Sequence, residues 1–234
     1  MPREHLFDNR DDLISALGSL CSESIEQAVE QRGSATFMVS GGSTPAPLYR
    51  QLANQDLPWA SVTVGLVDER WVPVSDAASN EAFIIRELLH SYAAQASLVG
   101  LWTEGLSLEQ GQQKAEASFQ SLSAPWDVVI LGMGGDGHTA SLFPFADGLG
   151  SALNTTERVA AIRADQSEVT GVHTERLTLT LAAILNAQKI ILLLTGAEKL
   201  SVYRQAMSSK DVKAMPVRAV LQQTQVPVDL YWAP

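Results

Sequence analysis

The sequence predicts an α/β fold with a mainly parallel sheet, and three observations lead to this. Short apolar runs, such as Val128–Leu131, alternate along the chain with longer segments of helical periodicity. These runs are continuously apolar, which is typical of strands buried on both faces of a parallel sheet. Glycine-rich or hydroxyl-rich loops follow several of them. We therefore expect parallel pairing of the strands, with right-handed helical crossovers between them.

In the first half of the chain, the expected elements are a helix over about 11–31, strands over 35–39 and 62–67, and a helix over about 79–89. Thr44 precedes Pro45, which predicts a helix N-cap followed by proline at the first helical position. Ser107 and Gln110 have the spacing of a capping box and indicate another helix start.

In the second half, the expected strands are 128–131, 159–162, 190–194 and 228–232. The segment 177–187 is expected to be mostly helix, although its Thr-Leu-Thr start is ambiguous. A further helix is expected to follow Gly196 and to run to about Met207. No repeat, low-complexity tract or linker divides the chain, so we expect one domain over residues 1–234.

Composition narrows the class of protein. The chain has 234 residues, 46% of them hydrophobic, and a formal net charge of −10. This charge argues against nucleic acid or an anionic membrane as a partner. If the substrate is an anion, positive side chains must gather locally to bind it.

No secretory signal and no apolar run of ~20 residues is visible, which predicts a soluble cytoplasmic protein. Cys21 is the only cysteine, and the four histidines lack metal-ligand spacing, so neither a disulfide nor a metal site is expected.

Polar residues follow four of the expected strands, and the carboxyl ends of parallel strands meet at one edge of a sheet. These strands end at Val39, Val67, Leu131 and Leu194. The first of the four loops consists of Ser40, Gly41, Gly42, Ser43 and Thr44. Its amide groups, its hydroxyls and the helix start after it suit a phosphate group. An ordinary capped strand-to-helix turn explains the same residues, but the convergence of four loops favours a binding cleft.

The loop after Leu131 carries the candidate base, His138, because imidazole titrates near neutrality and accepts a proton from water. Asp136 either orients this ring or caps the turn. Residues 132–137 formally match G-x-G-x-x-G, the motif of dinucleotide-binding folds. Dinucleotide binding is disfavoured because the motif lies past mid-chain and the residues after it do not suit a nucleotide-binding helix. A histidine satisfied by loop backbone is the alternative interpretation of His138.

Further charged candidates lie elsewhere in the sequence. Asp68 suits an acid, a base or a hydroxyl acceptor, and Arg70 suits an anion or an oxyanion. A surface salt bridge explains the same charges equally well. Arg176 and Lys199 are candidate phosphate ligands, or else solvated helix charges.

The chain resembles the bacterial 6-phosphogluconolactonases, within the glucosamine-6-phosphate deaminase/6-phosphogluconolactonase family. The segments that carry the resemblance are VSGGSTP at 39–45, VDERWVP at 67–73 with Ser79-Asn80, LGMGGDGHTASLFP at 131–144, RLTLT at 176–180 and LTGAEK at 194–199. They occur in the family's order and span most of the chain. Gly135 departs from the family, in which many relatives carry an acidic residue; we interpret this as tuning of the loop.

This resemblance implies a three-layer α/β/α fold of modified Rossmann type, with a mainly parallel sheet. It also implies hydrolysis of 6-phospho-D-glucono-1,5-lactone to 6-phosphogluconate in the pentose phosphate pathway, without cofactor or metal. It implies that His138 is the base that activates water, and that Arg70, Arg176, Lys199 and the Ser43–Thr44 loop contact the substrate. The expected partner is thus a small phosphorylated sugar lactone, and the expected state is a monomer or weak homodimer.

Two alternatives remain at this point. A sugar-phosphate deaminase or isomerase on the same fold is disfavoured because those deaminases place a glutamate where this chain has Phe143, and a tyrosine where it has Arg70. A non-catalytic sugar-phosphate sensor is disfavoured by the intact His138 and by the lack of a spare DNA-binding segment.

Overall fold

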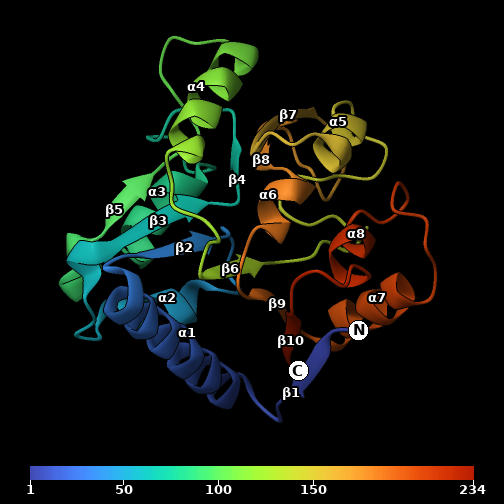
Figure 1. Ribbon diagram of the computed structural model, residues 1–234. Helices are drawn as coiled ribbons and strands as arrows, with labels where there is room; N and C mark the ends of the chain where they lie inside the picture. The colour runs from blue at the N-terminus through green and yellow to red at the C-terminus, as the bar shows by residue number, and fades with distance from the viewer.

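The computed structural model describes residues 1–234 and is built on a seven-stranded sheet in which every neighbouring pair is parallel (Figure 1). In spatial order the strands are β1 (Arg3–Leu6), β10 (Val228–Ala233), β9 (Ile190–Thr195), β6 (Val128–Leu131), β2 (Ala35–Val39), β3 (Val62–Leu66) and β5 (Ser97–Val99). The central strands are buried almost throughout, as their continuous apolar runs predict. The parallel sheet is therefore confirmed.

Helices cover both faces of this sheet. α1 (Arg10–Arg32) and α2 (Ala46–Ala53) pack against each other, and α3 (Asn80–Glu87) packs against α2. On the other side lie α6 (Leu181–Leu185), α7 (Ala197–Met207) and α8 (Val217–Leu221), with α8 against both of the others (Figure 1). The architecture is thus three-layered α/β/α, as predicted, and short 3-10 turns η1 (Trp59–Ser61) and η2 (Ser91–Gln95) complete its first half.

The direction in which the chain crosses the sheet reverses between β2 and β6. From β2 the chain proceeds to β3 and then β5, towards one edge of the sheet. From β6 it proceeds to β9 and then β10, towards the opposite edge. In open α/β sheets, ligands bind outside the carboxyl ends of the strands at such a reversal. The loops after β2 and β6 are the two that carry the predicted phosphate cradle and the predicted base.

A second, antiparallel sheet was not predicted. Its strands are β4 (Asp68–Arg70), β8 (Glu175–Leu179) and β7 (Val159–Arg163), in the order β4-β8-β7. Asp68–Arg70 is therefore itself a strand rather than the end of one. The expected helix over 177–187 is wrong at its start, because the chain remains extended to Leu179 and Thr180 then caps a short α6 by accepting a hydrogen bond from the amide of Ala183.

Two helices flank the small sheet, α4 (Leu108–Gln120) and α5 (Leu149–Asn154). The capping box at the start of α4 is confirmed: Ser107 Oγ accepts from the amide of Gln110, whose side chain accepts from the amide of Ser107. The predicted cap at Thr44 is wrong. α2 begins after Pro45, and no side chain accepts a hydrogen bond from the amides at its start.

No helix of the structure combines the length and the apolar character that crossing a membrane requires.

Candidate active site

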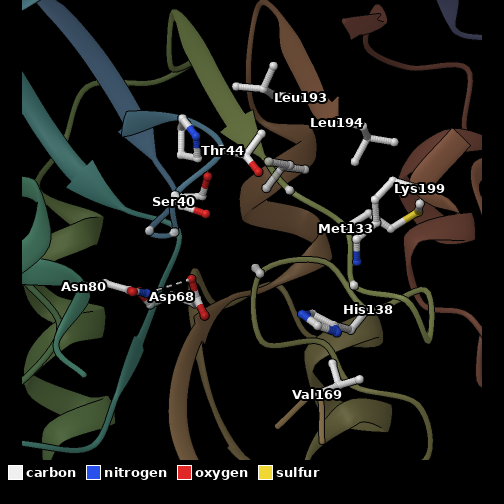
Figure 2. Close-up of a pocket in the computed structure, with 18 of the residues that line it drawn as sticks. Ser40, Thr44, Asp68, Asn80, Met133, His138, Val169, Leu193, Leu194 and Lys199 are labelled. Atoms are coloured by element: carbon white, nitrogen blue, oxygen red, sulfur yellow. Dashed lines mark hydrogen bonds between the residues drawn. The ribbon is translucent and has the colours of Figure 1, made fainter. Parts of the chain in front are cut away.

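The four predicted strand ends meet at one cleft of about 310 Å³ (Figure 2). Its lining includes residues 40–45 after β2, and Asp68, Arg70 and Arg176 from the small sheet. It also includes 131–134 and His138 from the end of β6 and the loop after it, and Thr195 and Lys199 from the end of β9 and the start of α7. The small sheet follows directly from β3, so its strands form one wall of the cleft. All the predicted site residues except Asp136 line this cavity, and Asp136 touches it through His138.

The loop over 41–44 presents unpaired donors to the cleft. None of its four backbone N–H groups donates a hydrogen bond to an acceptor in the chain. Gly42 has φ +101°, a conformation that glycine adopts without strain. The loop leads into α2, whose start has no side-chain cap. Amide groups of this kind, next to a helix N-terminus, bind anions.

Lys199 lies in the first turn of α7, whose start also lacks a side-chain cap. The ammonium group forms no ion pair with any carboxylate of the chain. Its charge therefore remains available to a bound anion. Together with the 41–44 loop, Lys199 gives the cleft a region of positive potential in a chain with a net charge of −10.

His138 is held by Asp136. The ring Nδ1 lies 2.6 Å from Asp136 Oδ1, and the same oxygen accepts the His138 backbone amide at 3.0 Å. This contact places the Nδ1 proton towards Asp136 and leaves Nε2, which has no partner in the chain, as the basic nitrogen. Burial opposes ionisation of Asp136, but the hydrogen bond and charge of His138 outweigh it, and the pKa of the carboxyl is lowered.

Asp68 does not contact His138. Its Oδ2 accepts a hydrogen bond from Ser141 Oγ at 2.6 Å, and its Oδ1 accepts one from Asn80 Nδ2 at 3.2 Å. The carboxylate is nearly buried, with 8% of the residue exposed, yet it lines the cleft. Asp136 is thus the carboxylate that is hydrogen-bonded to His138, and Asp68 is a separate, fixed hydrogen-bond acceptor in the lining of the cavity.

Arg70 and Arg176 are direct cross-strand partners on β4 and β8. Arg70 donates to the carbonyl of Ala78 at 2.5 Å, while its buried Nε has no partner. Arg176 donates to the carbonyls of His173 and Thr170, and burial lowers the pKa of its guanidinium. Like charges directly opposite each other destabilise a sheet. An anion between these two arginines relieves that repulsion, so the pair is suited to binding one.

Phe143 packs between two of the predicted site residues. Its ring centroid lies 4.4 Å from that of His138, and the Arg176 guanidinium carbon lies 5.4 Å from it. The side chain is nearly buried and carries no ionisable group. At this position the cleft therefore offers no second acid or base beside the histidine.

Sequence reasoning missed Glu69. This carboxylate is fully buried and accepts hydrogen bonds from the amides of Arg70, Asn80 and Glu81 and from Ser79 Oγ. Burial raises the pKa of Glu69 to about 7. It fastens β4 to the first turn of α3. The one feature of the sequence that indicates this contact is Ser79, which caps the start of α3.

The fold and the cleft define a doubly wound α/β protein. At the switch point of its sheet lies a cleft lined by unpaired loop amides, by cationic side chains and by a histidine that is hydrogen-bonded to an aspartate. The family model for glucosamine-6-phosphate isomerases/6-phosphogluconolactonase matches residues 8–232. The chain is 40% identical to a 6-phosphogluconolactonase of Rhizobium meliloti, over 98% of both chains. It is 38% identical to one of Pseudomonas putida, over 98% of this chain and 92% of that one.

A solved 6-phosphogluconolactonase from Shewanella baltica superposes with a TM-score of 0.95 at 40% identity, covering 100% of this chain and 98% of that one. A second structure, a 6-phosphogluconolactonase from Thermotoga maritima, has a TM-score of 0.82 at 23% identity and shows the same fold. This protein belongs to the glucosamine-6-phosphate isomerase/6-phosphogluconolactonase family.

Proposed function

We propose that this protein hydrolyses 6-phospho-D-glucono-1,5-lactone to 6-phosphogluconate, a step of the oxidative pentose phosphate pathway. The observation that carries the proposal is the His138–Asp136 pair, whose free Nε2 belongs to a cleft equipped for anions. The names of the relatives that match nearly the whole chain support the same reaction.

In this mechanism the 41–44 loop and Lys199 hold the substrate phosphate. The unpaired amides and the helix start bind the phosphate oxygens, and Lys199 supplies a charge without a competing carboxylate. Arg176 is the third phosphate contact, beside its role in holding the backbone at Thr170 and His173. Fixing the phosphate at one end places the lactone ring near the histidine.

The chemical step begins when Nε2 of His138 removes a proton from water as the water oxygen attacks the lactone carbonyl carbon. The carbonyl oxygen becomes an oxyanion, which the positive charge of the Arg70 guanidinium in the cleft lining stabilises. The bond to the ring oxygen then breaks, and this oxygen takes the proton from the imidazolium. Asp136 stabilises the positively charged ring meanwhile. A general base of this kind contributes about 10²–10⁴-fold, which suits a lactone that already hydrolyses spontaneously.

Asp68 is proposed to accept a hydrogen bond from a hydroxyl group of the sugar. Each of its oxygens accepts a hydrogen bond from a side chain of the protein, which fixes the carboxylate in the lining of the cavity. Phe143 disfavours a deaminase reaction. Ring opening in the deaminases needs an acidic side chain beside the histidine, and this chain has a phenylalanine at that place.

The test is hydrolysis of freshly prepared 6-phosphogluconolactone by the wild type and by His138→Ala. We expect the wild type to exceed the spontaneous rate clearly and His138→Ala to lose about 10²–10⁴-fold in kcat. A wild type no faster than the spontaneous reaction rejects the function. Full activity in His138→Ala rejects the base but keeps the function. Lys199→Ala is expected mainly to raise KM, and an unchanged KM rejects its phosphate contact.

The proposal includes a monomer or weak homodimer acting in the cytoplasm. Every residue assigned to the cleft comes from one chain, so the site needs no partner subunit. Light scattering across a concentration series measures the oligomeric state, and an obligate higher oligomer contradicts this part of the proposal.

A further inference from the structure

Asn80 is a buried cleft residue to which the proposed reaction gives no role. It is the first residue of α3, only 3% of it is exposed, and it lies beside Asp68 (Figure 2). A buried amide needs partners for its polar atoms. The partners that Asn80 has belong to two different parts of the cleft.

The first partner is Asp68. Asn80 Nδ2 donates to the backbone carbonyl of Asp68 at 2.9 Å and to its Oδ1 at 3.2 Å. Ser141 Oγ holds the other carboxylate oxygen at 2.6 Å. The Asp68 carboxylate is therefore fixed from two sides, and Asn80 is the donor that also fixes the backbone beneath it.

The second partner is the phosphate loop. A Cβ atom on Gly41 would lie 2.1 Å from Asn80 Oδ1, so the amide oxygen rests directly against the glycine backbone. Only a residue without a side chain fits at position 41 while Asn80 keeps this conformation. Asn80 thus lies between the loop after β2 and the strand β4.

The backbone of Asn80 is itself anchored. Its amide donates to Glu69 Oε1 at 2.7 Å, and Ser79 Oγ and the Glu81 amide donate to Glu69 Oε2. Since Glu69 follows Asp68 on β4, the start of α3 cannot shift without moving that strand. The Asn80 side chain therefore has a rigid base from which to hold its two neighbours.

We propose that Asn80 is a positioning residue that sets Asp68 relative to the Gly41 end of the phosphate loop. It touches neither reacting atom; it fixes the separation between the acceptor for a sugar hydroxyl and the cradle for the phosphate. The inference rests on the proposed function, because the separation matters for a ligand that spans both.

The test compares Asn80→Ala and Asn80→Asp with Ser79→Ala as matched control. Ser79→Ala removes bonds to Glu69 and to the Ala82 amide at the same helix start, but Ser79 lies outside the cleft. We expect Asn80→Ala to lower kcat/KM and the affinity for 6-phosphogluconate by about 10- to 100-fold, the usual range for a hydrogen bond to a charged group. We expect Ser79→Ala to stay within about three-fold in both measurements, because the backbone amides of Asn80 and Glu81 still hold Glu69 in this variant.

Asn80→Asp keeps the side-chain shape and loses the donor, so it is expected to lose at least as much as Asn80→Ala. An Asn80→Asp enzyme with wild-type kcat/KM overturns the proposal, as does an Asn80→Ala enzyme that matches Ser79→Ala. Circular dichroism melts confirm that each variant is assayed while folded.

A double-mutant cycle separates positioning from a general loss of structure. If Asn80 acts through Asp68, Asn80→Ala in an Asp68→Ala background costs less than about three-fold further. Multiplying losses overturn the proposal. Calorimetric binding of 6-phosphogluconate keeps the two proposals distinguishable: a wild type without lactonase activity rejects the function, while a weakened affinity in Asn80→Ala still supports the positioning role.

Discussion

A glycine determines whether the His138–Asp136 pair can form. A Cβ atom on Gly134 would lie 2.1 Å from His138 Nδ1 and 2.6 Å from Asp136 Oδ1, whereas one on Gly135 meets nothing closer than 3.8 Å. We predict that Gly134→Ala lowers kcat by about 10²–10⁴-fold, as loss of the base does. Gly135→Ala is the control and should remain within about two-fold. Equal kcat values for the two variants, measured on the lactone, contradict the prediction.

The lowered pKa of Asp136 predicts a pH dependence of stability. Because the carboxyl binds its proton less tightly in the folded state, the ionised pair stabilises the fold above the ordinary pKa of 3.8, and this contribution disappears as the pH falls through the lowered value. The free energies of unfolding of the wild type and of Asp136→Asn, measured with a denaturant, should therefore differ at pH values above 3.8. The difference should shrink on acidification below 3.8. A difference that grows towards acid contradicts the direction of the shift.

Individual site residues could be predicted where they follow a recognisable strand. His138, Lys199 and the 41–44 loop each occupy such a place, and the structure brings them to one cleft. The partners of Asp68 could not be predicted, because its bond to Ser141 joins residues 73 positions apart. The burial of Glu69 could not be predicted either, because most of its hydrogen-bond partners lie at the start of a helix further along the chain and not beside it in the sequence.

At the scale of elements, α4 completes the exposed edge of β7. Glu116 Oε2 accepts the amides of Arg158 and Val159, both at 2.8 Å, and Gln112 Oε1 accepts the amide of Ala161 at 3.1 Å. These helix side chains take the place of a neighbouring strand. An edge that is paired in this way no longer presents free N–H groups to other chains.

We predict that Glu116→Ala destabilises the protein by about 1–3 kcal/mol, because two backbone donors lose their acceptor. Gln113→Ala, on the exposed side of the same helix, serves as the control and should change stability by less than about 0.5 kcal/mol. Chemical denaturation of both variants measures the difference. If Glu116→Ala is no less stable than Gln113→Ala, the helix does not support this edge.

Elements could be predicted from sequence when their pattern was unambiguous. The ranges 35–39 and 128–131 coincide with β2 and β6, and a helix after Gly196 does end at Met207. The segment RLTLT was misread because leucines two apart, followed by Leu-Ala-Ala-Ile-Leu, fit a helix as well as a strand. The segment is a strand because it pairs with both β4 and β7. This pairing joins distant parts of the chain, so a short stretch of sequence does not reveal it.

At the scale of the whole molecule, the cleft belongs to both sheets. The parallel sheet supplies the phosphate loop, the histidine loop and the turn before Lys199, while the antiparallel sheet supplies Asp68, Arg70 and Arg176. The α/β class was predicted from the central strands, but the second sheet was not, so the wall that carries both arginines was missing from the sequence-based view. The proposed function therefore requires that the two sheets keep a fixed position relative to each other.

The packing indicates how that relation is kept, and it leads to the last prediction. One cluster of 60 buried hydrophobic residues includes side chains from the parallel sheet together with Val159, Ile162, Leu177 and Leu179 of the small sheet. We propose that residues 1–234 accordingly fold as a single domain.

Unfolding in denaturant should then be one cooperative transition, with the same midpoint for tryptophan fluorescence, for far-ultraviolet circular dichroism and for loss of lactone hydrolysis. The fluorescence is a suitable probe because Trp126 lies in this core and Trp71 directly follows β4 of the small sheet. Activity that disappears well before the main transition, or two separated midpoints, means that the antiparallel sheet unfolds on its own. In that case the cleft can open while the parallel sheet stays folded, and the chain consists of two cooperative units.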